Sequence, residues 1–194
     1  MTKYNFCLSF SKSVMMLWIL LLILIFCSCN NNDRLVKEVR ALSGREILFP
    51  KGYCSLSYQN SMPIDSLLAT DIKIVSYIND LPCTSCGVRM LHTWIEQVKQ
   101  IDPEVAYVIV VQTPQKDVLF NNIDSMRLPY PLLYYEDSVF GEVNKLDVLA
   151  RNKTFLLDKK NRIVVVGEPF GNEKLSQLYK KAIASLKMEY THGL

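Results

Sequence analysis

The 194-residue sequence has few histidines and no large excess of charge, and its one long apolar run is short for a membrane span. Its histidines are His92 and His192, which leave too few ligands for an imidazole-based zinc site. The formal net charge is +3 at pH 7, a small value that indicates no nucleic-acid-binding surface. Internal repeats are also absent. The sequence therefore predicts one ordinary globular domain behind a short N-terminal targeting segment.

The N-terminal segment has the pattern of an export signal. Lys3 and Lys12 are the only charges before an unbroken apolar run at residues 14–26. This run of 13 residues suits the core of a signal peptide, whereas a membrane-spanning helix needs roughly 20 apolar residues. An uncleaved membrane anchor is the alternative. In both cases we expect the body of the protein outside the cytoplasm.

The end of the apolar run resembles a bacterial lipoprotein signal, in which a small residue precedes the cysteine that receives the lipid. Ser28 before Cys29 fits this pattern, whereas Phe26 before Cys27 does not. We therefore expect cleavage before Cys29 and lipidation of Cys29. The resemblance implies a lipid anchor in a bacterial membrane of the cell envelope, with the protein facing the periplasm or the cell surface.

The expected domain boundaries follow from that cleavage. They are a signal peptide at residues 1–28, a tether at residues 29–42, an N-terminal extension at residues 43–70 and the main domain at residues 71–194. The signal removes Lys3 and Lys12 from the 22 Lys and Arg residues, so the remaining 20 nearly balance the 19 Asp and Glu residues. The remaining chain of about 165 residues is long enough for one domain with a real core.

A Cys-x-x-Cys motif, formed by Cys83 and Cys86, lies between a predicted strand at residues 72–78 and a predicted helix at residues 83–100. At a helix N-terminus, unpaired backbone N–H groups and the positive end of the helix dipole favour the thiolate, the reacting form of cysteine. Two sulfurs one turn apart can also close into a disulfide. This placement indicates a thiol–disulfide active site with Cys83 and Cys86 as its catalytic residues.

Several alternatives remain open for the motif and its neighbours. A structural zinc site needs a second pair of ligands, and a purely structural disulfide needs none. Cys54 is either a third redox residue or a small buried apolar one. His92 projects roughly opposite Cys83, which favours a solvated surface histidine over a general base. Asp80 and Glu96 are candidate acid–base helpers, with ordinary solvated carboxylates as the alternative.

The remaining sequence alternates between strand and helix patterns. We expect an extended arm or short strand at residues 46–53, a strand buried on both faces at 106–112, a helix at 116–126, an extended segment at 131–135, a short helix at 140–146, a hairpin of strands at 153–157 and 162–166, and a closing helix at 172–186. Five residues of the closing helix are predicted to share one side: Leu175, Leu178, Tyr179, Ala182 and Leu186.

Strand, Cys-x-x-Cys helix, strand, helix, hairpin and helix follow one another in the order of thioredoxin. Residues 154–163, Thr-Phe-Leu-Leu-Asp-Lys-Lys-Asn-Arg-Ile, look like the Thr-Phe-Leu-Ile-Asp-x-x-Gly-x-Ile hairpin of thioredoxin-like proteins of the TlpA/ResA kind. The resemblance covers roughly residues 71–186. It implies an α/β thioredoxin-like fold, with a central mixed sheet flanked by helices and an N-terminal extension. It also implies a membrane-attached, extracytoplasmic thiol–disulfide oxidoreductase with Cys83 as nucleophile and Cys86 as resolving cysteine.

The sequence departs from that family at two positions. Pro82 stands where family members usually have tryptophan before the first cysteine, and Asn152 stands where the family has a cis-proline that faces the disulfide. Because a cis peptide bond without proline costs about 3 kcal/mol, we expect a trans bond at Asn152. Arg151 and Asn152 thus form the predicted substrate-facing loop, and its surface is expected to differ from that of the family.

Two other functions are compatible with the sequence. One is a redox-inactive thioredoxin-like binding module, which the missing tryptophan and cis-proline favour. The other is a Cu(I) metallochaperone that holds the metal between two thiolates. Copper carriers on this fold usually add a histidine, and neither His92 nor His192 is well placed. We expect no cofactor and no metal site, with protein thiols or disulfides and a membrane electron donor as candidate partners and no nucleic acid.

Overall fold

The computed structural model covers most of the chain that follows the targeting segment. The described residues are 14–16, 18, 30–51, 54–56, 64–79, 84–126, 132–146 and 153–192. The chain divides into two units, Met1–Ala41 and Leu42–Leu194. The predicted tether is helical, since helix α2 spans Asn30–Leu42. The second unit holds the β-sheet and the helices that pack on it.

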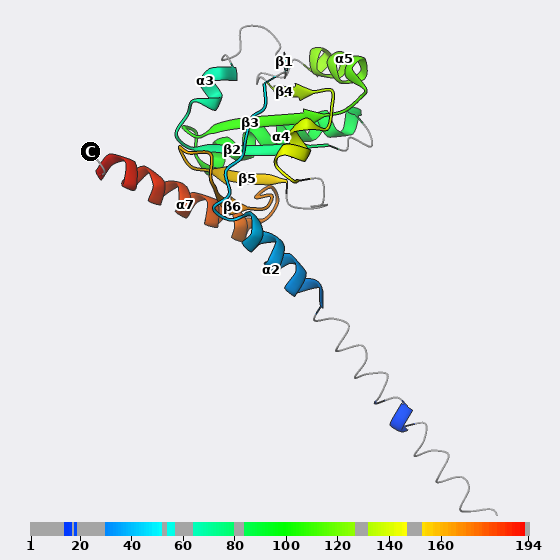
Figure 1. Ribbon diagram of the computed structural model, residues 1–194, viewed down its shortest axis with the longest axis vertical. Helices are drawn as coiled ribbons and strands as arrows, with labels where there is room; N and C mark the ends of the chain where they lie inside the picture. The colour runs from blue at the N-terminus through cyan, green and yellow to red at the C-terminus, as the bar shows by residue number, and fades with distance from the viewer. Residues whose placement is uncertain are drawn as a thin grey trace, which may run out of the picture. The chain divides into compact units, whose positions relative to one another are not determined.

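Six strands form one mixed sheet in the order β1-β4-β3-β2-β5-β6 (Figure 1). The strands are β1 (Cys54–Leu56), β2 (Lys73–Ile78), β3 (Ala106–Gln112), β4 (Leu132–Tyr135), β5 (Thr154–Leu157) and β6 (Ile163–Val166). β4, β3 and β2 are mutually parallel, whereas β1 and β5 run antiparallel to their neighbours, as does β6 to β5. The carboxyl ends of the three parallel strands therefore share one edge, where sheets of this type usually carry their functional sites.

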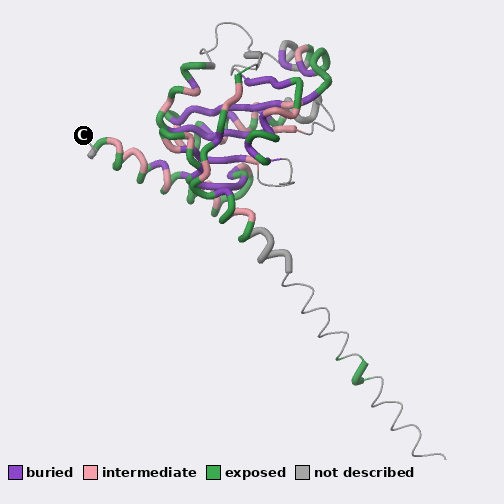
Figure 2. The backbone as a smooth tube through the Cα atoms, viewed as in Figure 1, coloured by how far each residue is buried: buried purple, intermediate pink, exposed green. Residues whose placement is uncertain are grey.

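Strand β3 is buried on both faces, as its run of β-branched residues predicts. Six of its seven residues are buried, and the last, Gln112, is intermediate. Figure 2 shows the central strands as largely buried, whereas α7 alternates between buried and exposed positions. A strand of this kind needs a covering layer on each side of the sheet.

One face of the sheet is covered by three helices. The helices of this unit are α3 (Ile64–Leu68), α4 (Thr84–Ile101), α5 (Lys116–Met126), α6 (Val139–Val143) and α7 (Glu173–His192). Leu91 of α4, Leu119 of α5 and Tyr179 of α7 belong to one buried apolar cluster with Ile74 and Ile109 of the sheet. This cluster is the main core, and it fixes α4 against the two central strands.

The opposite face is covered by α6 and by the extended arm that precedes β1. The ring of Phe140 lies 5.2 Å from that of Tyr77, 5.6 Å from that of Tyr135 and 5.8 Å from that of Phe49, measured between centroids. Tyr77 is three positions from Ile74 in β2, and an odd spacing along a strand places two side chains on opposite faces. The sheet is therefore flanked on both sides, as the sequence predicts.

Most of the predicted elements around the core are confirmed, and one detail is corrected. Of the two forms predicted for residues 46–53, residues 46–51 adopt the extended arm, in which Glu46 makes an isolated bridge with Arg162. Leu178 was expected on the buried side of the closing helix, but it is 49% exposed. The buried side of α7 is centred on Tyr179 and Ile183 instead.

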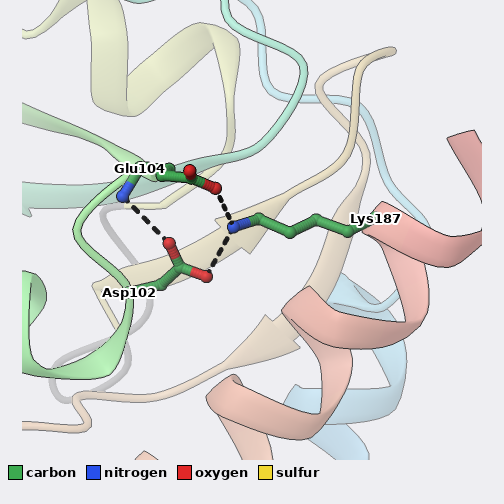
Figure 3. A network of polar contacts seen from close by, with 3 residues as sticks. All are labelled: Asp102, Glu104 and Lys187. Atoms are coloured by element: carbon green, nitrogen blue, oxygen red, sulfur yellow. Dashed lines mark hydrogen bonds and ion pairs between the residues drawn. The ribbon is translucent and has the colours of Figure 1, made fainter. Parts of the chain in front are cut away.

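Lys187 of α7 forms ion pairs with two carboxylates in the turn between α4 and β3 (Figure 3). Lys187 Nζ lies 2.8 Å from Asp102 Oδ2 and 2.6 Å from Glu104 Oε2. The backbone N–H of Glu104 also donates a hydrogen bond to Asp102 Oδ1 at 2.9 Å. Although partial burial acts to raise the pKa of Asp102, the hydrogen bonds from Lys187 and from backbone N–H groups outweigh it and lower that pKa.

Within the described part of the chain, no helix is both long and apolar enough to cross a membrane. Cys29, Cys27 and most of the apolar run at residues 14–26 lie outside the described residues. The signal peptide and the lipid anchor therefore stay predictions from the sequence.

Candidate functional site

The candidate site lies at the carboxyl end of β2. That strand ends at Ile78, and α4 begins at Thr84, the residue that follows Cys83 in the sequence. Cys86 is the third residue of α4, and its backbone is helical. Four predicted site residues lie outside the described residues: Asp80, Cys83, Arg151 and Asn152.

Helix α4 supplies the electrostatic environment that the sequence predicts for a Cys-x-x-Cys motif. The helix is 18 residues long and begins inside the motif. Its first backbone N–H groups have no acceptor within the helix, and the positive end of its dipole lies there. Its first turn contains no acidic residue. A negative charge at this end is therefore stabilised, which for a thiol lowers the pKa.

A lysine joins the two segments that lead into the site. Lys153 precedes β5, Asn79 follows β2, and Lys153 Nζ donates a hydrogen bond to Asn79 Oδ1. The ammonium group also lies 5.7 Å from the ring centroid of Tyr77, whose backbone N–H donates to the Lys153 carbonyl at 2.8 Å. These contacts hold Lys153, the residue just before β5, close to the end of β2.

Three hydroxyl groups form a buried chain across the sheet near the same edge. Tyr107 Oη donates a hydrogen bond to Ser76 Oγ at 3.0 Å, and Ser76 Oγ lies 3.1 Å from Thr154 Oγ1. All three residues are buried. Burial raises the pKa of Tyr107 despite its hydrogen bond to Ser76, so its phenol stays neutral at physiological pH. The chain joins β2, β3 and β5 through side chains and stiffens the part of the sheet that supports α4.

Glu168 is a candidate site residue that sequence reasoning missed. It lies just after β6, where Val166 pairs with Phe155 and the backbone N–H of Gly167 donates to the Thr154 carbonyl at 2.8 Å. The antiparallel register places Glu168 at the sheet edge where β2 ends. Its side chain is exposed, although neighbouring groups partly desolvate the carboxyl group and raise its pKa. In the sequence it belongs to a Gly-Glu-Pro-Phe turn, and only the strand order brings that turn to the site.

The other candidates lie away from the start of α4. Glu96 Oε1 accepts a hydrogen bond from Lys99 Nζ at 2.8 Å, and both side chains are exposed. His92 is half-buried on α4 rather than fully solvated. Cys54 lies in β1, three strands from β2, which corresponds to roughly 14 Å at the usual strand spacing. No group of three His, Cys, Asp or Glu residues that could hold a metal occurs among the residues that the structure describes.

The fold has counterparts among solved structures. No protein-family model and no curated protein matches the sequence. A thioredoxin-like protein in its oxidized form is 11% identical with a TM-score of 0.51, over 74% of this chain and 96% of that chain. That likeness shows a thioredoxin-like fold and confirms the predicted fold class.

Two further structures are similar at lower scores. A protein of Chlorobium tepidum assigned as the thiol:disulfide interchange protein DsbE is 11% identical with a TM-score of 0.49, over 74% of this chain and 97% of that chain. A protein of Bacteroides thetaiotaomicron assigned as a protein disulfide isomerase is 16% identical with a TM-score of 0.48, over 77% of this chain and 95% of that chain.

Proposed function

We propose that the protein is a membrane-anchored, extracytoplasmic thiol–disulfide oxidoreductase in which Cys83 attacks and Cys86 resolves. One observation carries the proposal. An 18-residue helix begins at Thr84, inside the Cys-x-x-Cys motif, and is the next element after a central parallel strand of a thioredoxin-like sheet. A helix N-terminus at that edge favours thiolate chemistry, and the i, i+3 spacing allows the two sulfurs to form a disulfide.

The reaction proceeds by two exchanges that conserve sulfur and electrons. The Cys83 thiolate attacks one sulfur of a partner disulfide, and the partner's other sulfur leaves as a thiolate. Cys86 then attacks the Cys83 sulfur, which forms the Cys83–Cys86 disulfide and releases the partner's second thiolate. Two electrons pass to the partner, and a reductant such as a membrane electron donor returns the pair to the dithiol. The reverse sequence oxidises the partner.

The location of the enzyme follows from its N-terminal sequence. We assign residues 1–28 to a cleaved signal and Cys29 to the lipidated residue, because Ser28 precedes it and a polar segment follows it. The thioredoxin-like domain then lies outside the cytoplasm, attached to the membrane by lipid. Arg151 and Asn152 are assigned to the substrate-facing surface because Lys153, the next residue, borders the site.

Reduction of insulin disulfides tests the redox function. The full-length chain in detergent is expected to accelerate dithiothreitol-driven insulin precipitation, and Cys83→Ser and Cys86→Ser are expected to abolish the acceleration. Cys54→Ser is the control, because Cys54 lies in β1 at the far side of the sheet. Equal activity in wild type, Cys83→Ser and Cys86→Ser would overturn the assignment.

Metabolic labelling with a radioactive fatty acid tests the anchor. We expect label on the wild-type protein and on Cys27→Ala, and none on Cys29→Ala, which should also lose signal processing or membrane retention. Label that disappears with Cys27→Ala and persists in Cys29→Ala would refute the assignment of Cys29.

A further inference from the structure

Asn144, the residue that follows α6, gathers four neighbours into one surface patch. Its side chain accepts a hydrogen bond from the Leu48 N–H and donates one to the Leu48 carbonyl, each at 2.8 Å. Its own carbonyl accepts a hydrogen bond from Arg45 Nη2 at 2.7 Å. The extended arm and the end of α6 thus share one surface, which we call the arm patch and define by Arg45, Leu48, Val143 and Lys145.

Two apolar side chains of the arm patch are open to solvent. Leu48 is 48% exposed and Val143 is 44% exposed. Ile47, the residue before Leu48, is 1% exposed, because consecutive residues of an extended segment point to opposite sides. The arm therefore buries one side chain in the core and presents the next one outward. Apolar groups that gather on a surface in this way indicate a contact with a partner or a membrane.

Positive charges outnumber negative ones around the arm patch. The arm runs beside the β5–β6 turn, where Glu46 makes its bridge with Arg162. Asp158 of this turn accepts the backbone N–H groups of Lys160 and Arg162, each at 2.8 Å. Its charge also acts on the buried ammonium group of Lys73. The other charged residues along the arm, the end of α6 and positions 160–162 are five cations and two acids: Arg45, Lys51, Lys145, Lys160, Arg162, Glu46 and Glu142.

We propose that the arm patch is a docking surface for the anionic phospholipid headgroups of the membrane that holds the protein. This inference rests on the membrane attachment proposed above. Helix α2, the predicted tether, has 13 residues and ends at Leu42, three residues before Arg45. Because a helix of that length measures about 20 Å, the membrane stays within reach of the patch. The cations attract the negative headgroups, and Leu48 and Val143 enter the boundary between headgroups and acyl chains.

A weak contact is sufficient for this role, because the anchor already keeps the domain beside the membrane. Each cation close to an anionic membrane surface strengthens binding by roughly fivefold. Burial of a half-exposed leucine contributes a factor of about the same size. The patch therefore orients a tethered domain. It lies on a face of the sheet, whereas α4 begins at the carboxyl edge, so docking holds that edge alongside the membrane, within reach of a membrane electron donor.

The test compares the full-length protein, extracted from bacterial membranes, in two kinds of vesicle. One contains phosphatidylglycerol and phosphatidylethanolamine, and the other contains phosphatidylcholine alone. Flotation shows that the chain is bound, and the acetylation rate of each lysine is then followed by mass spectrometry. Lys145 is expected to react roughly fivefold more slowly on the anionic vesicles, and less so at 1 M NaCl, because salt screens the contact. Lys116 should react equally on both, because α5 covers the opposite face of the sheet.

Leu48→Ser is expected to remove most of the protection of Lys145 and to leave the fold intact, because Leu48 is bound to Asn144 through its backbone. Val118→Ser is the matched control, since Val118 is 45% exposed on α5, and it should keep the wild-type protection.

Equal acetylation of Lys145 on both vesicles, in a chain that floats with them, overturns the inference and leaves the membrane attachment standing. A Leu48→Ser protein that is protected like wild type, or equal losses in the two variants, also overturns it. A chain that floats with neither kind of vesicle overturns the membrane attachment itself.

Discussion

Asn144 fixes a segment whose position the local sequence does not reveal. Its side chain accepts a hydrogen bond from the Leu48 N–H at 2.8 Å and donates to the Leu48 carbonyl at 2.8 Å and the Phe140 carbonyl at 3.0 Å. Asn144 is 1% exposed. Leu48 is 96 positions away, so no pattern around Asn144 identifies its partner. The extended arm is thereby held against α6.

Asn144→Ala is expected to lower the free energy of unfolding by about 2–3 kcal/mol, because the part-buried N–H and carbonyl groups of Leu48 lose their partner while the Phe140 carbonyl keeps the Asn144 backbone N–H. Urea denaturation measures this change. Asn172→Ala is the comparison, since Asn172 Oδ1 accepts a solvent-exposed hydrogen bond from the Leu175 N–H at 3.1 Å, and such a cap is worth about 1 kcal/mol. If both variants cost the same, the Asn144 side chain does not hold the arm.

Tyr107→Phe removes the first donor of the buried hydroxyl chain and is expected to cost about 1 kcal/mol at neutral pH. Because the pKa of Tyr107 is raised in the folded state, its contribution is fully present below the unfolded pKa, near 10, and is lost as pH rises through the folded pKa. The difference between wild type and variant should therefore shrink above pH 10. Tyr179 and Lys73, whose pKa values are also shifted, are present in both proteins. A difference that stays constant up to pH 11 in urea denaturation would contradict this account.

Among the helices and strands, the sequence predicts those whose bounds are set by a local residue pattern. The bounds of β3 are the predicted ones because burial on both faces demands a continuous apolar run. The β5–β6 hairpin follows from its turn, in which Asn161 adopts a φ of 56° that asparagine tolerates. By contrast, β1 has three residues and exists through its pairing with β4, and α3 has five residues, too few for a periodic signal.

The residues of the candidate site also divide into those that a local sequence pattern predicts and those that it does not. Cys86 was placed on a helix by its motif and the apolar strand before it, and that placement is confirmed. Glu168 was not found, because its link to α4 passes through contacts such as Gln97 with Gly171, which are 74 positions apart. Such pairings depend on the strand order of β5 and β6, and a single sequence does not reveal them.

Lys187 is expected to stabilise the docking of α7 through its carboxylate pair by about 0.5–1 kcal/mol, the usual range for a largely exposed ion pair. Lys187→Ala should lose that amount at low salt and less at 1 M NaCl, because salt screens the pair. Lys180→Ala, which removes an exposed lysine of the same helix, should change little. Urea denaturation at both salt concentrations measures these changes.

The pH dependence gives a second check on the same pair. The pKa of Asp102 is lowered in the folded state, so its contribution is present above the unfolded pKa and is lost as pH falls through the folded pKa. The Lys187→Ala effect should therefore fade as pH is lowered below about 4. An effect of equal size at pH 7 and pH 3 would show that Lys187 acts through packing rather than charge.

For the whole molecule, the fold and the proposed chemistry depend on different observations. The thioredoxin-like fold is inferred from the strand order, the register and the structural likeness. The proposed chemistry is inferred from the position of α4, which begins inside the motif and follows β2. The proposed extracytoplasmic location is inferred from the lipoprotein-like N-terminal segment, which is not part of the sheet. A thioredoxin-like domain without redox function would keep every element of the fold and differ only in the behaviour of Cys83 and Cys86.

The glutathione adduct of Cys83 tests the central claim most directly. Reduced full-length wild type and Cys86→Ser are mixed with glutathione disulfide, and each cysteine is mapped by peptide mass spectrometry. We predict a stable adduct on Cys83 in Cys86→Ser, and in wild type only a transient adduct that gives way to the Cys83–Cys86 disulfide. An adduct that persists equally in both proteins, or that forms on Cys54 instead of Cys83, would contradict the account.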